Sequence, residues 1–369
     1  MYHIAKILSI ARPTHTCRLW FGVLRHVLPP HRVDMPLEVA EAVLATRHPD
    51  GATSCIRSHE VDASPACDLM VVVPAYNAGD RLKVCVESVL GQHTRYGLRM
   101  VVVDDGSTDG AVARLRDECT DSRLTVISLN ENRGVSAARN MALRHIDARY
   151  VTFVDSDDEL PQGAVEAWLA AADAADADVV EGSMAEADGG RVKMLVRHAD
   201  GEPTERLTGF ACGKVFASRL FAEVGFPEGT RYEDTLLSFV LYRLARRTTT
   251  VAQTTYIYNR HQGSFTSKEM GNYASIDAYW VVRRLLQDID KLGIRRDDAL
   301  YDALLMGMKL SGNRMDSLDE ETSTAYFAAM CGLAENYFAS QRPGKSLKYI
   351  DKAIRERNHT LYILASCLL

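Results

Sequence analysis

The chain has 369 residues, of which 47% are hydrophobic and 25% are charged, as in ordinary soluble globular proteins. This length exceeds what one compact core usually holds and predicts two domains. The formal net charge of −6 provides no basic field for a nucleic-acid backbone, which argues against a nucleic-acid partner. The eight cysteines are scattered without metal-ligand spacing, which predicts buried thiols in a reducing, cytoplasmic compartment.

The N-terminal segment mixes basic and apolar residues. Lys6, Arg12, Arg18 and Arg25 interrupt it, and no apolar run in the chain approaches the ~20 residues that cross a bilayer. Two interpretations stay open: an amphipathic helix packed on its own protein, or peripheral contact with an anionic membrane surface. The last nine residues, LYILASCLL, raise the same alternatives.

A polar stretch ends at residue 67 and is typical of a linker. Beyond it, short apolar runs alternate with segments whose apolar residues recur at helical spacing. The predicted strands are 69–73, 100–103, 124–129, 150–154 and a fifth containing 179–180. The predicted helices are 80–90, 111–119, 135–146 and 164–172.

This alternation predicts an α/β fold whose mostly parallel sheet is covered by helices on both faces. From about residue 268 the pattern is helical throughout. The predicted divisions are an N-terminal extension with its linker (1–67), a sheet domain (68–267) and a helical C-terminal region (268–369). Because ligands of such sheets bind at the carboxyl ends of the strands, the residues that follow each strand are the candidates for chemistry.

The first two strands each end in polar residues. Pro74 is expected to stop the first strand and to be followed by an aromatic ring and an amide, Tyr76 and Asn77. The second strand ends in the sequence Asp-Asp-Gly-Ser-Thr-Asp, which begins with the acidic pair Asp104 and Asp105. Ser107 or Thr108 is expected to cap the next helix. Capping needs only one of these side chains, so the acidic pair would be in excess of what the structure requires. A carboxylate there can accept hydrogen bonds from a pyrimidine N–H or a ribose hydroxyl.

Four acidic residues follow the fourth strand within five positions: Asp155, Asp157, Asp158 and Glu159. Such a group repels itself unless a cation lies among the carboxylates or most of them reach solvent. Mg²⁺ and Mn²⁺ prefer carboxylate oxygens and are commonly bound by one or two of them together with substrate phosphates. The position beside a second acidic pair therefore predicts a metal site at this edge of the sheet.

Another polar motif opens the helix that starts after Gly134, whose N-terminal amides favour an anion. Arg139 and Asn140 fall outside the apolar face of this helix, so we expect them to point away from the core. Arg139 is a suitable partner for a phosphate or for a flanking carboxylate.

Taken together and in this order, these motifs closely resemble the family 2 glycosyltransferases with the GT-A fold, over roughly residues 68–265. The motifs are Pro74-Ala75-Tyr76-Asn77, Val103-Asp104-Asp105-Gly106-Ser107-Thr108-Asp109, Asn132-x-Gly134-x-Ser136-x-x-Arg139-Asn140 and Asp155-Ser156-Asp157-Asp158. The resemblance implies a Rossmann-like domain that binds a nucleotide sugar with Mn²⁺ or Mg²⁺.

The resemblance also implies roles for single residues. Asp105 and Tyr76 would lie at the donor base, and Asp157 would bind the metal and the diphosphate. The implied donor-binding residues are Pro74, Tyr76, Asn77, Asp105, Arg139, Asp155, Asp157 and Arg260. Arg260 belongs to the segment 258–264, which resembles one that closes over the donor in capsule- and exopolysaccharide-type members. Asp234, in a Glu-Asp pair expected at the start of a later helix, is the implied catalytic base.

The family's Q-x-x-R-W motif of processive enzymes is missing, which implies addition of a single sugar. The expected activity is inverting, non-processive transfer from a nucleoside diphosphate sugar, typically a UDP-sugar, to a carbohydrate or lipid-linked glycan. Two alternatives are a sugar nucleotidyltransferase and a non-catalytic nucleotide-sugar-binding or assembly protein. The missing Gly-rich loop after the first strand argues against the former, and the intact acidic set argues against the latter.

Overall fold

The computed structural model describes residues 14–261 and 271–369, which fall into two compact units. The sheet unit comprises Thr53–Gly229 and Leu236–Gln262. The helical unit comprises Met1–Ala52, Thr230–Thr235 and Gly263–Leu369. These divisions differ from the predicted ones, because the N-terminal residues join the C-terminal helices and a short internal segment joins them as well.

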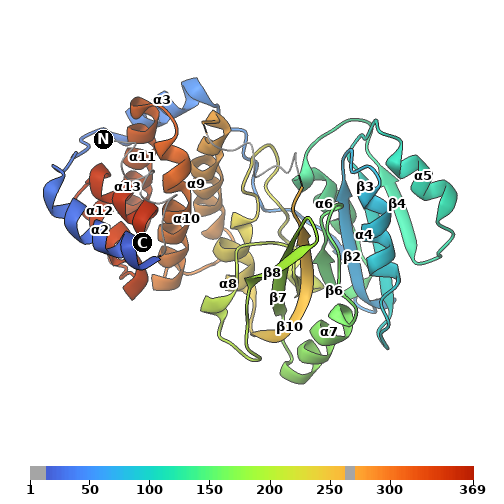
Figure 1. Ribbon diagram of the computed structural model, residues 1–369. Helices are drawn as coiled ribbons and strands as arrows, with labels where there is room; N and C mark the ends of the chain where they lie inside the picture. The colour runs from blue at the N-terminus through green and yellow to red at the C-terminus, as the bar shows by residue number, and fades with distance from the viewer. Residues whose placement is uncertain (1–13, 262–270) are drawn as a thin grey trace. The chain divides into compact units, whose positions relative to one another are not determined.

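An eight-stranded sheet forms the core of the sheet unit, in the order β10-β7-β9-β6-β2-β3-β4, with β8 paired to β7 (Figure 1). The strands are β2 (Cys67–Ala75), β3 (Leu98–Asp104), β4 (Leu124–Ser128), β6 (Ala148–Phe153), β7 (Val179–Asp188), β8 (Arg191–Val196), β9 (Lys214–Ala217) and β10 (Thr248–Asn259). Strand β9 pairs antiparallel with β6 and β7, and β8 pairs antiparallel with β7. The other ladders of this sheet are parallel. The predicted mostly parallel α/β sheet is confirmed.

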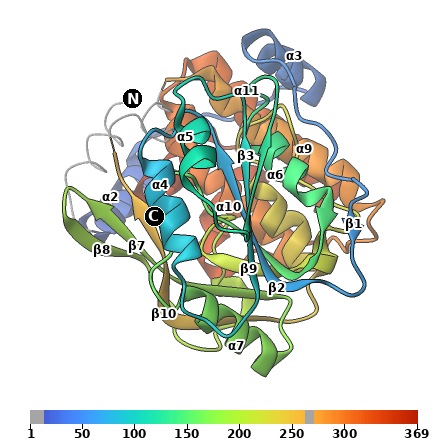
Figure 2. The same ribbon diagram turned by 90° about the vertical axis from the view of Figure 1, so that its right-hand side faces the viewer.

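Helices cover both faces of this sheet (Figures 1 and 2). They are α4 (Arg81–Leu90), α5 (Ala111–Glu118), α6 (Val135–Leu143) and α7 (Ala164–Ala175). Because side chains alternate between faces along a strand, Val71 and Val73 of β2 point to the same side, where they join a buried cluster with α4, α5 and α7. Helix α6 covers β2 and β3 on the other side, where Phe153 lies.

Strand β2 does not stop at Pro74 as predicted, but continues to Ala75 in register with β3. The carbonyl of Val72 accepts from Val154, so residues 72 and 74 direct their backbone polar groups toward the β6 side. Pairing with β6 ends at Val72, so an N–H at position 74 would have no hydrogen-bond partner on β6. The absence of this donor in proline therefore costs no ladder hydrogen bond. Proline is therefore tolerated in this central strand.

The predicted linker is ordered against the sheet unit. Strand β1 (Glu60–Val61) pairs in parallel with β5 (His145–Ile146), and the amide of Arg57 donates to the carbonyl of Glu223 over 2.9 Å. Helix α6 therefore ends at Leu143 rather than at residue 146, because β5 takes the last two residues of the predicted helix.

Strand β10 was not predicted, although it is twelve residues long and pairs with β7 in parallel. The predicted fifth strand, 179–180, is the beginning of β7. Its carboxyl end and that of β10 lie side by side, with Asn259 opposite Ala187.

A fully buried ion pair near the start of β7 joins β7 and β9 to a helix. Lys214 of β9 and Glu181 of β7 have no exposed side-chain surface, and Nζ lies 3.1 Å from Oε1. The ammonium also donates to the carbonyl of Thr208 and to the hydroxyl of Tyr242, each over 3.0 Å. Burial alone would raise the pKa of Glu181, but Lys214, His198 and Thr208 hold it at about 2. Tyr242 begins α8 (Tyr242–Leu244), directly after the π-helix η3 (Leu237–Leu241).

The helical unit combines helices from both ends of the chain. They are α2 (Thr14–Val27), α3 (Leu37–Arg47), α9 (Asp277–Ile289), α10 (Asp298–Asp316), α11 (Glu320–Tyr337), α12 (Lys348–Arg355) and α13 (His359–Leu368). Helix α2 packs on α13 and α3 packs on α11, as the blue and red ribbons of Figure 1 show. The described part of the N-terminal segment thus packs on its own protein, and residues 1–13 lie outside the described residues.

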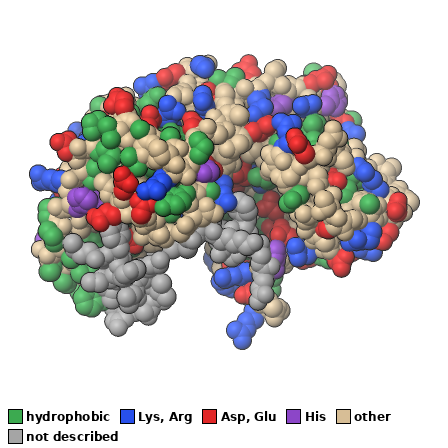
Figure 3. Space-filling view, turned by 90° about the horizontal axis from the view of Figure 1, so that it is seen from above, with side chains coloured by type: hydrophobic (Ala, Val, Ile, Leu, Met, Phe, Trp, Pro, Cys, Tyr) green, Lys and Arg blue, Asp and Glu red, His purple; other side chains and the backbone are tan. Residues whose placement is uncertain are grey.

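Within 14–261 and 271–369, no helix combines the length and apolarity that membrane crossing requires. Acidic and basic side chains are interspersed over the face seen in Figure 3, as expected from the composition.

Candidate functional site

The loops after β2 and β3 are tied together by hydrogen bonds. Asn77 has a left-handed backbone (φ 49°), its amide donates to Ser107 Oγ over 3.1 Å, and its Oδ1 accepts from the Thr108 amide over 2.8 Å. Ser107 and Thr108 therefore do not cap α5, contrary to the prediction. Helix α5 follows Gly110, and its first amide donates to Asp109 instead.

Both members of the acidic pair have structural hydrogen bonds, so the prediction that the pair exceeds structural need is wrong. Asp104 accepts from the amide of Ser107 and the hydroxyl of Ser128. Asp105 is buried, and its two oxygens accept from the amides of Arg133 (2.7 Å) and Gly134 (2.8 Å). The Asp105 carboxylate thereby fixes the start of α6, and each oxygen keeps a second lone pair.

Arg139 and Asn140 are buried, 3% and 5% exposed, so the prediction that they point away from the core is wrong. The reason is a second covering layer, the segment after β9, which packs over α6. Asn140 exchanges two hydrogen bonds with the backbone of Phe226. The Arg139 guanidinium carbon lies 5.0 Å from the Phe226 ring centroid, and Nη2 lies 3.4 Å from Asp155 Oδ1. The predicted pairing of Arg139 with a flanking carboxylate is therefore present.

The acidic loop after β6 presents two partly exposed carboxylates. Asp155 and Asp157 have side chains that are 42% and 33% exposed. Asp157 Oδ2 lies 2.7 Å from Nε2 of His261, which follows the end of β10. The carboxylate and the imidazole thus converge from the loop after β6 and the end of β10, which are joined by the bridge between Glu159 and Ile257.

Asp158 faces inward and anchors β10. It is 1% exposed, and its carboxylate oxygens lie 2.7 Å from the Tyr256 hydroxyl and 2.8 Å from the Asn259 amide. Burial and the neighbouring charge of Asp155 raise the pKa of Asp158 well above its usual range. Asp158 therefore serves to hold the acidic loop against the end of β10, where Asn259 also donates to Glu159.

Two further predicted donor-binding residues have exposed side chains. Tyr76 is 51% exposed. The Arg260 side chain is 60% exposed, with Nη1 3.7 Å from Oε1 of Glu186 on β7. Residues 262–264 of the predicted closing segment lie outside the described residues.

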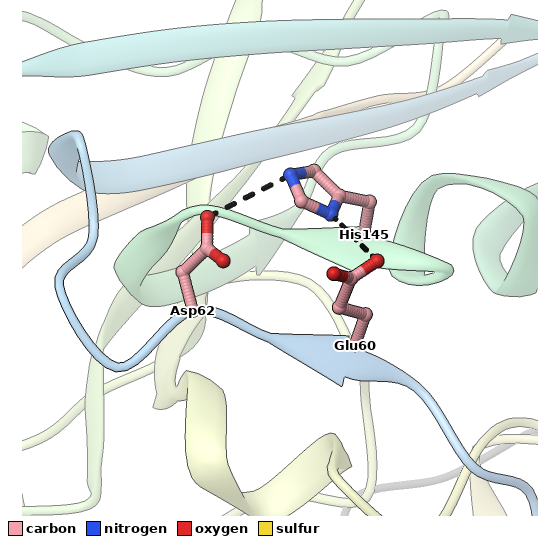
Figure 4. Close-up of side chains that lie close together, drawn as sticks. All are labelled: Glu60, Asp62 and His145. Atoms are coloured by element: carbon pink, nitrogen blue, oxygen red, sulfur yellow. Dashed lines mark ion pairs between the residues drawn. The ribbon is translucent and has the colours of Figure 1, made fainter.

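A different acidic cluster is the one place in the described residues where three metal-ligand side chains lie within 4.8 Å: Glu60, Asp62 and His145. Figure 4 shows that the two carboxylates approach opposite nitrogens of the imidazole, Glu60 at Nδ1 (3.2 Å) and Asp62 at Nε2 (3.6 Å). One ion cannot replace both contacts without reorientation of the ring. The cluster is best described as ion pairs across β1 and β5.

Asp157 and His261 provide a better chemical match to a divalent cation bound together with a substrate. A carboxylate oxygen is the ligand that Mg²⁺ and Mn²⁺ prefer, and imidazole is a common metal ligand. Two protein ligands are sufficient where phosphate oxygens complete the coordination. The residues at this edge therefore fit a metal–diphosphate group.

Asp234 lies in the helical unit, in a turn directly before a helical segment, as predicted for the Glu-Asp pair. The Thr235 amide donates to the carbonyl of Tyr232 over 2.9 Å and closes this turn. Tyr232 has a left-handed backbone (φ 59°), and the π-helix η3 follows. Both features are unusual and are enriched at functional sites.

Sequence reasoning missed the individual contributions of Tyr256, Asn259 and His261. The predicted segment 258–264 contains the last two, but nothing in a single sequence shows which of its side chains turn toward the acidic loop. The pairing of β10 with β7 decides this, because it brings the end of β10 to the loop after β6.

Comparisons with known proteins find a matching family model, similar sequences and similar structures. Residues 70–226 match the family described as glycosyl transferase family 2. Glycosyltransferase GlyG of Streptococcus pneumoniae is 27% identical over 301 residues, 75% of this chain and 99% of that protein. The glucosyltransferase WfaP of Escherichia coli, named for UDP-Glc and α-D-GlcNAc-diphosphoundecaprenol, is 38% identical over 88 residues, 24% of this chain and 34% of WfaP.

Two solved structures show the same fold. Staphylococcus aureus TarS 1–349 superposes with a TM-score of 0.58 at 20% identity, covering 81% of this chain and 90% of TarS. It has also been solved with UDP-GlcNAc. The mannosyltransferase PcManGT of Pyrobaculum calidifontis, solved with GDP-Man and Mn²⁺, has a TM-score of 0.50 at 16% identity over 98% of this chain and 97% of PcManGT.

Proposed function

Because the chain is a family 2 glycosyltransferase of the GT-A type, we propose that it transfers one sugar, with inversion, from a UDP-sugar to a glycan acceptor. The observation that carries this proposal is the convergence of Asp157 and His261 at the carboxyl edge of the sheet, next to the exposed Asp155. UDP is proposed because WfaP is named for a UDP donor and TarS has been solved with UDP-GlcNAc.

The donor base is proposed to contact the loops after β2 and β3. Tyr76 offers an exposed aromatic ring beside Asn77, whose position Ser107 and Thr108 fix. Asp105, with one lone pair remaining on each oxygen, is proposed to accept from the base N–H. Pro74, the last residue but one of β2, precedes these residues in the chain.

The diphosphate is proposed to bind at the acidic loop. Asp157, assisted by His261, would hold Mn²⁺ or Mg²⁺, which when bound neutralises charge on the leaving diphosphate. Asp155 forms an ion pair with Arg139, which is proposed to hold the loop after β6 in place before the donor binds. Arg260, whose Nη1 lies 3.7 Å from Oε1 of Glu186, is proposed to offer a further positive charge to the phosphates.

The acceptor hydroxyl is proposed to lose its proton to Asp234. The activated oxygen attacks the anomeric carbon on the face opposite the departing nucleoside diphosphate, which inverts the configuration. The glycosidic C–O bond forms as the bond to the diphosphate breaks, and Asp234 keeps the proton. The acceptor class is proposed from WfaP, which is named for a lipid-linked sugar, and from the resemblance to capsule-type members.

The test is a transfer assay with a panel of UDP-sugars, Mn²⁺ or Mg²⁺ and free or lipid-linked glycans. The proposal requires UDP release that depends on the acceptor, with a product of inverted configuration by NMR. A nucleotidyltransferase would instead release pyrophosphate from a nucleoside triphosphate and a sugar phosphate. Donor binding without turnover on every acceptor would favour a non-catalytic binder.

Replacing Asp157 by Ala is expected to remove most of the stabilisation that UDP confers in the presence of Mn²⁺, because the cation loses its carboxylate ligand. A thermal-shift titration measures this, since a ligand that binds only the folded protein raises the apparent melting temperature. The matched control is Asp117→Ala, which removes an exposed carboxylate on α5. Equal Mn²⁺-dependent shifts in both variants would remove Asp157 from the proposed metal site.

A further inference from the structure

The turn that carries Asp234 has its backbone fixed by a buried carboxylate of the helical unit. The amide of Arg231 donates to Asp277 Oδ2 over 2.8 Å. Asp277 is the first residue of α9, and its side chain is 5% exposed. Although the turn is followed in sequence by the sheet unit, residues 230–235 make their main contacts with the helical unit.

The second oxygen of the same carboxylate is held by a histidine from a distant part of the chain. His48 Nε2 lies 2.9 Å from Asp277 Oδ1. His48 directly follows α3, and its carbonyl accepts from Trp280 Nε1 over 2.9 Å, so its backbone is fixed to α9. With Nε2 as the donor, the imidazole and the Arg231 amide together fix the plane of the carboxylate.

Tyr232, the first residue of the turn, is held by a contact of its side chain with α10. Its left-handed backbone is disfavoured for a residue with a large side chain, so surrounding contacts must maintain it. The Arg314 guanidinium carbon of α10 lies 4.4 Å from the Tyr232 ring centroid, within the range of a cation–π contact. Asp234 thus lies between a fixed amide at 231 and a turn closed by Thr235.

We propose that Asp277, backed by His48, is a positioning residue that sets the orientation of Asp234 for proton abstraction. This inference rests on the proposed role of Asp234 as the base. A general base must lie within hydrogen-bond reach of the proton it removes, and small displacements of a reacting group are costly. Asp277 and His48 therefore contribute to catalysis by aligning the base.

A purely structural role for Asp277 predicts a different pattern of effects. A buried acid at a helix start is favoured by the helix dipole, and its loss would then lower stability without a selective effect on the chemical step. A positioning role predicts a selective fall in kcat for transfer, while the dissociation constant of UDP is unchanged. These two outcomes separate the roles.

The experiment measures kcat, acceptor KM and UDP affinity for three variants of the full chain. Asp277→Ala removes both contacts and is expected to lower kcat about 10–100-fold. Asp277→Asn should stay within a few-fold of the parent, because its amide oxygen can accept from Arg231 while its NH₂ donates to the other tautomer of His48. His48→Ala, which alters a side chain 31% exposed, should give a smaller loss and serves as the second variant where Asp277→Ala folds poorly.

The matched controls are Asp351→Ala and Asp351→Asn. Asp351 is also buried in the helical unit, where it accepts from Tyr301 and Arg355 over 2.8 Å, away from the turn. Controls with unchanged kcat support the inference. Equal losses in the Asp277 and Asp351 alanine variants, or no loss in His48→Ala and Asp277→Ala, would overturn it.

A double-mutant cycle separates this inference from the proposed function. In an Asp234→Asn background, Asp277→Ala should cause no further loss of single-turnover rate, because the group it orients is gone. If Asp234→Asn transfers at the parent rate, the base assignment fails. If Asp234→Asn is slow but Asp277→Ala lowers its rate by the same factor as in the parent, only the positioning inference fails.

Discussion

Replacing Asp234 by Asn is expected to slow sugar transfer by about 10²–10⁴-fold, the usual contribution of a general base. The amide is nearly isosteric but cannot take the proton of the acceptor hydroxyl at neutral pH. Binding of UDP and Mn²⁺ should be unchanged, because Asp234 is not among the residues proposed to bind the nucleotide or the cation. Initial rates at saturating donor and acceptor, with calorimetric titration of UDP, measure the two effects separately.

Glu233→Gln is the matched control, because it makes the same change of acid to amide at the neighbouring position. Its effect on kcat is expected to be much smaller than that of Asp234→Asn. A larger effect at Glu233 would assign the role of catalytic base to Glu233 in place of Asp234. A strong loss of UDP affinity in Asp234→Asn would show that this residue acts in donor binding.

Replacing Lys214 by Met is expected to lower the free energy of unfolding by about 3–5 kcal/mol, as for other broken buried pairs. The substitution keeps most of the side-chain volume but leaves the Glu181 carboxylate inside the sheet unit without its ammonium partner. It also removes the hydrogen bond that ties Tyr242 of α8 to β9. Guanidinium denaturation followed by circular dichroism gives the change in unfolding free energy.

Lys83→Met is the control for a pair on the surface. Lys83 Nζ lies 3.1 Å from Glu118, and the two side chains are 63% and 56% exposed. Exposed pairs contribute little to stability, so this variant should be nearly neutral. Similar losses in both variants would contradict the assignment of Lys214 as a buried structural cation. Combining Lys214→Met with Glu181→Gln should recover part of the loss, because no buried charge then remains unpaired.

The central strands and the loops after them were predictable because local patterns determine both. Apolar runs rich in valine such as 69–73 and 100–103 are typical of strands buried on two faces, as in a parallel sheet, which places the acids after them at one edge. Strand β10 was missed because its threonines mix polar and β-branched character, so neither strict alternation nor an apolar run marks it.

The remaining differences depend on contacts between residues far apart in sequence. Arg139 is polar and lies off the apolar face of α6, yet the segment containing Phe226 covers it and stacks on its guanidinium. His48 and Asp277 are 229 residues apart, so no local spacing could have joined them. Helix α3 likewise joins the helical unit through its packing on α11 and through Glu41, which accepts from the Tyr279 hydroxyl of α9.

The most direct test of the metal-dependent donor site is an anomalous-diffraction map, recorded at the manganese edge, from crystals grown with UDP and Mn²⁺. The proposal predicts a strong peak in bonding distance of an Asp157 carboxylate oxygen and of a UDP phosphate oxygen. A sole peak at Glu60, Asp62 and His145, or UDP bound without any peak at Asp157, would contradict it.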